Sequence, residues 1–351
     1  MSLATQRKQT SHAVADLWQN TFFGHYWRAI GIFLGRGKAV SIWKSAAVVM
    51  IANLLLGVGI SALLGETRFI TIPEILKHLM WITYTYSAIL LFLSLHSSLL
   101  EFLSLRLVAS IETERNLQDL QTWARQWLGW KPPQFIFSVG FSSIATIAAF
   151  LAVYPATHFS MGVILIYFIN FFHLGPNVYG LISLIDFLLR LRNWSLNLYP
   201  DDPGSSPILL QLSEQLRDYI LQYSLSIALF MLISLLVVGF NRLTIAEFLI
   251  VSWIPILTVF ILGHYAFSSL IKRVKYERMG ELQSRIMKLS SKQGTDANAT
   301  SQIMSLMDYH DRVKSARTSL INSQTIVNLI GSLALPTLAT LIKVYVQDLF
   351  K

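Results

Sequence analysis

The chain has 351 residues, of which 54% are hydrophobic and 13% are charged, and its formal net charge at pH 7 is +9. Soluble globular proteins carry about 25% charged residues, so this composition excludes an ordinary soluble fold. The sequence contains no cysteine, which excludes disulfides, thiolate metal sites and cysteine nucleophiles.

Several hydrophobic stretches contain about 20 residues or more, the length at which an apolar helix crosses a bilayer. The predicted fold class is therefore all-α, a polytopic membrane helix bundle of about seven spans with a cytosolic helical hairpin between the last two. The lipid bilayer is the expected partner. Basic residues collect on the cytosolic side of membrane proteins, beside anionic lipids, so the positive charge does not predict a nucleic-acid partner.

Residues 1–40 are predicted to form an amphipathic N-terminal segment on the cytosolic side. From about Ala13 to Gly37, aromatic and aliphatic residues recur on one helical side, and basic residues lie near the end of the segment. This pattern is typical of a helix that lies in the membrane interface, and it also fits an amphipathic helix buried in protein.

Residues 41–266 are predicted to form the membrane bundle, with spans that begin at about residues 41, 78, 134, 161, 219 and 244. Two amphipathic connections on the cytosolic side, residues 112–133 and 193–218, belong to this region. The first connection contains Trp123, Trp127 and Trp130. Because amphipathic aromatic rings favour the membrane–water boundary, we expect this connection to lie beneath the bilayer.

The fourth predicted span contains Gly175-Pro176 in its interior. Proline removes a backbone donor and kinks a helix, and the carbonyl group that loses its partner must find another one within a membrane. Asn170, His173 and Asn177 lie on one helical face beside this kink. The cluster predicts either a solute or ion site, or polar groups that satisfy one another across a helix interface.

Residues 267–324 are predicted to form the cytosolic helical hairpin. Apolar positions keep helical spacing from Phe267 to Leu289, so the sixth span should continue for roughly 35 Å beyond the membrane as one rod. Polar turn residues around Gly294 follow, and a second apolar stripe begins at Ile303. Two such stripes bury themselves most simply by facing each other.

Residues 325–351 are predicted to form the last membrane helix and the C-terminus. At 100° per residue the polar residues of this helix fall on one face, which should look at protein or water because unpaired polar groups are costly in hydrocarbon. With the cluster in the fourth span, this face supplies the residues of a candidate solute path, namely Asn328, Ser332, Thr340 and Lys343. The alternative is packing against neighbouring helices, with Lys343 reaching the interface.

Basic residues are frequent in the N-terminal segment and in alternate connections, which predicts a cytosolic N-terminus and a C-terminus outside. A re-entrant final segment would place both ends inside. Short external loops favour a bacterial inner (cell) membrane. In outline, this architecture is similar to that of insect odorant and gustatory receptor channels, and the resemblance implies no roles for particular residues.

Enzyme motifs that combine spacing and context are absent from the sequence, including nucleotide-binding glycine loops, HExxH and GxSxG. We therefore assign no catalytic, cofactor-binding or metal-binding residues and expect no cofactor. The leading hypothesis is a non-enzymatic, homo-oligomeric channel or transporter for a small solute or ion. The alternatives are a membrane-anchored signalling or scaffold protein that binds a cytosolic protein through the hairpin, and a membrane enzyme that acts on lipid.

Overall fold

The computed structural model describes residues 3–19, 28–33, 42–66, 70–129, 132–153, 160–237, 242–291, 297–320 and 323–349. Regular structure within these ranges is helical, apart from an isolated antiparallel bridge between Ile111 and Leu196. The all-α prediction is therefore confirmed. The main helices are α1 (Leu3–Gln19), α3 (Ile42–Leu63), α4 (Ile72–Phe102), α5 (Val108–Ser110), α6 (Glu114–Trp127), α7 (Pro132–Val153), α8 (Met161–Leu191), α9 (Pro207–Val237), α10 (Arg242–Ser290), α11 (Ala297–Ser315) and α12 (Ser323–Leu349).

Three helical segments are long and apolar enough to cross a membrane: Lys44–Leu63, Met161–Leu191 and Trp253–Ser290. They lie in α3, α8 and α10 and correspond to the first, fourth and sixth predicted spans. Large apolar side chains remain exposed on these helices and on their neighbours, as expected where lipid covers a helix face. Examples are Ile51, Leu55, Ile144, Ile147, Ile254, Ile261, Ile330 and Leu341.

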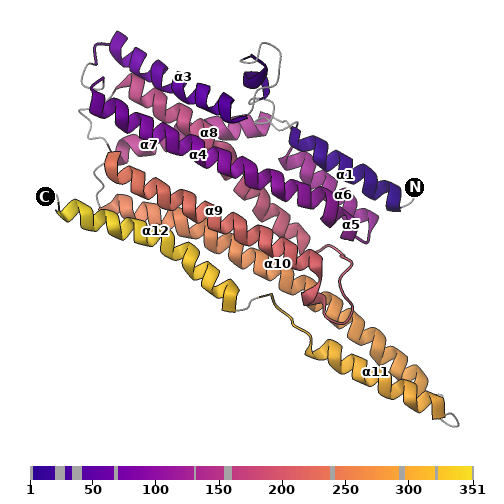
Figure 1. The fold of residues 1–351 in the computed structure, drawn as a ribbon. Helices are drawn as coiled ribbons and strands as arrows, with labels where there is room; N and C mark the ends of the chain where they lie inside the picture. The colour runs from indigo at the N-terminus through magenta and orange to yellow at the C-terminus, as the bar shows by residue number, and fades with distance from the viewer. Residues whose placement is uncertain are drawn as a thin grey trace.

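The long helices form two packed groups, which are visible in Figure 1. One group contains α3, α4, α7 and α8, and the other contains α9, α10 and α12. Contacts of α4 with α9 and of α8 with α10 join the groups. The short helices α1, α5 and α6 gather at the end of the bundle toward which α10 extends, whereas α12 ends at the opposite side (Figure 1).

Helix α10 runs without interruption from Arg242 to Ser290 and so continues well past the apolar part of its sequence. Helix α11 packs against the distal half of α10. The buried side chain of Lys275 on α10 donates hydrogen bonds to the carbonyl oxygens of Lys314 and Ala316, at 2.6 and 2.7 Å. These contacts fix the end of α11 against α10.

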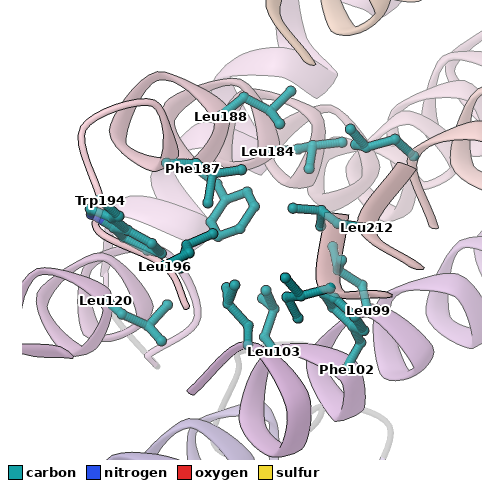
Figure 2. Close-up of a cluster of buried hydrophobic side chains, with 14 of the residues drawn as sticks. Leu99, Phe102, Leu103, Leu120, Leu184, Phe187, Leu188, Trp194, Leu196 and Leu212 are labelled. Carbon is teal, nitrogen blue, oxygen red and sulfur yellow. The ribbon is translucent and has the colours of Figure 1, made fainter. Parts of the chain in front are cut away.

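The largest buried cluster lies where the end of α4, α6, α8 and the start of α9 meet. Figure 2 shows Leu103, Leu120 and Phe187 in this cluster, with Trp194 and Leu196 from the segment after α8. All five side chains are at most 2% exposed. A π-helical turn, Leu103–Leu107, carries the end of α4 into the cluster without breaking the helix before Ser110.

The expectation that residues 112–133 lie beneath the bilayer stays a prediction, and in the part that the structure describes α6 is covered by protein on its apolar face. The apolar face of α6 packs against protein, with Leu117 and Trp123 each 2% exposed and the Trp123 indole N–H donating to the Ser183 carbonyl oxygen at 3.1 Å. On another side, α1 covers α6, and the side-chain amide of Gln121 donates to the Thr10 hydroxyl at 2.6 Å. An amphipathic pattern predicts one covered face but does not distinguish lipid from protein.

The N-terminal helix fits the second of the two predicted arrangements, an amphipathic helix that packs against protein. Helix α1 starts at Leu3, about ten residues before the expected start, and ends at Gln19. Its Val14 side chain is fully buried, and the Arg7 guanidinium donates to the Ile111 carbonyl oxygen at 2.6 Å. The described part of this segment therefore packs against the bundle, and residues 20–27 and 34–41 lie outside the described residues.

Candidate functional site

The structure places the two groups of predicted site residues apart. Asn170, His173 and Asn177 lie on α8, which packs against α3, α4 and α7. Asn328 and Ser332 lie on α12, which packs against α9 and α10, and both line a cavity between these three helices. The α8 residues are not part of that cavity wall. The structure therefore does not bring the two groups together in this cavity.

The polar groups of α8 make contacts within the helix interfaces. Asn170 is fully buried, and its side-chain oxygen accepts a hydrogen bond of 3.1 Å from the Asn53 amide on α3. The Nδ1 atom of His173 lies 2.7 Å from the Ile169 carbonyl oxygen and 3.4 Å from the Tyr86 hydroxyl. Asn177 is half-buried. These contacts fit the alternative that the cluster serves helix packing.

Close packing also explains Gly175, the residue before the proline. A Cβ atom at this position would lie 2.8 Å from the Cα atom of Ser138 on α7, which is too close for any other residue. Helix α8 remains helical through Pro176 and continues to Leu191. The Gly-Pro pair thus permits the contact between α7 and α8, as small residues often do between membrane helices.

The polar face of α12 begins inside the protein. The Ser332 hydroxyl donates to the Asn328 carbonyl oxygen, one turn earlier, at 2.8 Å, and Ser332 is 1% exposed. Asn328 is half-buried. The side chains of Thr340 and Lys343 lie outside the described residues, so their part of the predicted path stays a prediction.

The cavity between α9, α10 and α12 has a volume of about 330 Å³. Cavities of roughly 300–1,000 Å³ accommodate small-molecule ligands. The walls come from one face of each helix and from two connecting segments, one before α9 and one before α12. The lining residues are Gly204, Ser205, Leu210, Ser213, Glu214, Leu216, Arg217, Ile220, Val259, Phe260, Gly263, His264, Phe267, Arg317, Leu320, Asn328, Leu329 and Ser332.

Charged and apolar residues occupy different ends of this cavity. Helix α9 starts just after the segment that contains Ser205, so Glu214 and Arg217 lie nearer that end than Ile220. Arg317 reaches the same end from the segment before α12. At the far end Val259 and Phe260 form an apolar wall. We call the end with the connecting segments the charged mouth.

The arginines of the charged mouth differ in their contacts. Arg217 pairs with Asp218 at 3.1 Å, and both side chains are more than 40% exposed, so the pair is a weak one. Within the described ranges Arg317 has no ion-pair partner. An added Cβ atom at Gly204 would lie 3.4 Å from the Arg317 Cβ atom and 3.5 Å from its carbonyl oxygen. Both arginines are exposed lining residues of the cavity.

Sequence reasoning missed Glu214, Arg217, His264 and Arg317. One available signal was the spacing of residues 210, 213, 214, 217 and 220, which places them on one face of α9 with both apolar and charged members. The contribution of Arg317 had no local signal, because it depends on the meeting of two connecting segments that are about 110 residues apart in the sequence.

Groups of three or more His, Asp or Glu side chains that could hold a metal ion do not occur among the residues that the structure describes. Comparison of the chain with protein-family models, curated proteins and solved structures found no match. The fold and the cavity therefore define the class of protein: an all-helical chain with three helices able to cross a membrane and a ligand-sized cavity between α9, α10 and α12.

Proposed function

We propose that this protein is a non-enzymatic integral membrane protein, a channel or transporter that takes up a small solute or ion through the cavity between α9, α10 and α12. The observation that carries the proposal is that Asn328 and Ser332, from the polar face of α12, line a cavity of about 330 Å³ with a charged mouth. A polar helix face inside a bundle of apolar helices is a functional candidate.

Seven spans are part of the proposal. Beyond α3, α8 and α10, the helices α4, α7, α9 and α12 contain 31, 22, 31 and 27 residues. At 1.5 Å per residue, each is long enough for a hydrocarbon core of about 30 Å.

The proposed orientation places the N-terminus in the cytosol and the C-terminus outside. Helix α6, the segment after α8 and the pair α10–α11 lie toward the same end of the bundle, and α12 ends at the other (Figure 1). Positive charge is retained on the cytosolic side, so this arrangement supports a cytosolic hairpin made of distal α10 and α11. A bacterial inner membrane and a homo-oligomeric assembly remain part of this proposal.

The second candidate function is a signalling or scaffold role for the proposed hairpin. Met287 on α10 and Met304 and Met307 on α11 are 69%, 64% and 52% exposed. Exposed methionines adapt to differently shaped partners, so this surface favours a cytosolic protein partner. Replacement of all three by glutamine should abolish capture of that partner while leaving membrane insertion intact; unchanged capture would exclude the hairpin surface.

The test of the transport proposal is K⁺ and Cl⁻ flux across liposomes that contain purified protein. We expect Asn328→Leu/Ser332→Leu to reduce flux at least tenfold, because it makes the cavity wall apolar. Asn170→Leu/Asn177→Leu is the matched control, and it should leave the flux of inserted protein unchanged. Loss of flux in the control pair alone would move the path to α8, and no flux in the wild type would contradict transport of these ions.

A further inference from the structure

We infer that the cavity binds an organic anion with an apolar body, such as a medium-chain carboxylate, with its charged group at the mouth between Arg217 and Arg317. This inference rests on the proposed function, since it names the class of solute that the same cavity takes. It follows from the distribution of charge and apolar surface along the cavity.

The charged mouth favours an anion. Arg217, Arg317 and Glu214 are the charged residues of the cavity lining, and two further carboxylates lie beside it: Asp218, which pairs with Arg217, and Asp202, next to Gly204. Guanidinium groups bind carboxylate and phosphate oxygens through paired N–H donors. Arg317 makes no ion pair within the described ranges, and the pair of Arg217 with Asp218 is exposed and easily exchanged. An arriving anion can therefore engage both without breaking a buried contact.

The end of the cavity away from the mouth carries apolar side chains beside Ser332, whose hydroxyl already donates to the Asn328 carbonyl oxygen. Ile220, Val259 and Phe260 line the end away from the mouth. Val259 is 1% exposed and Ile220 is 9% exposed, so this end is closed by packed side chains. An apolar chain that enters it leaves water, and each buried methylene strengthens binding by a few-fold.

Gly204 supports the position of the mouth. It lies in the short 3-10 turn Pro203–Ser205 and is buried against Arg317. An added Cβ atom would meet the Arg317 Cβ atom at 3.4 Å and its carbonyl oxygen at 3.5 Å, so alanine is accommodated, whereas a larger residue must move the segment that carries Arg317. Gly204 is thus a positioning residue for this arginine.

The test is equilibrium binding of octanoate to the full chain in nanodiscs, with empty discs as the background. Octanol and octylammonium have the same apolar body with a neutral or a positive end, and acetate and phosphate carry the anion without the body. Octanoate should bind at least tenfold more tightly than any of these. If octanol bound as tightly as octanoate, the arginines would play no part in recognition. If acetate bound as tightly, the apolar end of the cavity would play no part. Either result overturns the inference.

Substitutions at the lining residues test whether octanoate binds in this cavity. Arg217→Gln/Arg317→Gln should weaken octanoate binding about tenfold or more, whereas Arg285→Gln, on an exposed arginine of α10 outside the cavity, should not change it. Glu214→Gln should tighten binding, because it removes a carboxylate from the mouth. An unchanged affinity in the double arginine variant would overturn the inference.

Discs that contain phosphatidylglycerol distinguish two sources of the anion. If this lipid displaces octanoate, the site binds an anionic lipid headgroup. If octanoate stays bound, the site binds a free organic anion. Because binding is measured without flux, the proposals separate: octanoate binding without any flux would contradict transport alone, and K⁺ or Cl⁻ flux without octanoate binding would contradict the inference alone.

Discussion

The ammonium group of Lys275 donates a hydrogen bond of 2.6 Å to the carbonyl oxygen of Lys314, and so joins α10 to the last turn of α11. The Lys275 side chain is 6% exposed, and its second bond, to the Ala316 carbonyl oxygen, measures 2.7 Å. The last carbonyl groups of a helix have no partner within the helix, so a cation there both satisfies them and interacts favourably with the helix dipole.

We expect Lys275→Met to loosen α11. The change leaves two partly buried carbonyl groups without their donor, at a cost of about 1–3 kcal/mol. Hydrogen exchange followed by mass spectrometry should show faster exchange in residues 297–315. Lys272→Met, on an exposed lysine one turn earlier, is the control and should have no effect on α11. Equal protection in all three proteins would mean that Lys275 does not hold the two helices together.

The crossing of α3 and α8 gives a second prediction. A Cβ atom at Gly162 would lie 2.2 Å from the Gly57 carbonyl oxygen, so a side chain there must push the helices apart. Gly162→Val should lower the melting temperature in detergent by about 10 °C or more, because overpacking a closely packed contact costs at least 1–3 kcal/mol.

Gly140→Val is the matched control for this crossing. Gly140 lies on α7 with no heavy atom within 4 Å of an added Cβ, so the same change of volume should be tolerated. Two variants of equal stability would show that α3 and α8 do not approach each other as closely at Gly57 and Gly162 as the structure has them.

The charged end of α8 gives a third prediction. Asp119 on α6 accepts hydrogen bonds of 2.8 Å from the Arg190 guanidinium and from the Trp194 indole N–H. Trp194 is 2% exposed, so Asp119→Ala leaves a buried donor without a partner. We expect destabilisation by about 1–2 kcal/mol, after discounting the partly exposed ion pair. Asp218→Ala, in an exposed pair, should change the unfolding midpoint by much less.

The contact between α11 and the loop before α9 should depend on pH. Burial, together with the hydrogen bond to Asp201, raises the pKa of the Tyr309 phenol above its usual value of 10.0. A phenol with a raised pKa binds its proton more tightly in the folded state. Its contribution to stability is therefore fully present below pH 10 and is lost as the pH rises through the higher folded-state pKa.

Absorbance of tyrosinate at alkaline pH tests this contact. Subtracting the titration of Tyr309→Phe from that of the wild type should isolate one phenol that ionises above pH 10. A difference curve centred at or below pH 10 would show that Tyr309 does not donate to Asp201.

Local patterns predicted some elements well. The sixth span and its extension were expected from about residue 244 to 289, and α10 runs from Arg242 to Ser290. This success has a simple cause, because apolar residues keep one helical spacing throughout and Pro255 is the single proline inside the helix. The turn near residue 196 depends instead on a long-range bridge between Ile111 and Leu196.

Contacts between distant residues were not predictable from these patterns. The partner of Asn170 is Asn53, which is 117 residues away, and the same polar face fits either a site or a helix interface until that partner is known. Arg217 and Arg317, 100 residues apart in the sequence, likewise come to line one cavity only in the fold. Periodicity predicts which face of a helix is covered, but the identity of the covering group depends on tertiary packing.

The measurement that tests the central claim most directly uses the absence of cysteine from the sequence. Asn328→Cys introduces a single thiol into the cavity wall, and Asn177→Cys introduces one on α8. Treatment with a negatively charged methanethiosulfonate reagent should block ion flux through the first variant by at least tenfold and leave the second and the wild type unaffected. Unchanged flux through a fully modified Asn328→Cys protein would contradict a solute path between α9, α10 and α12.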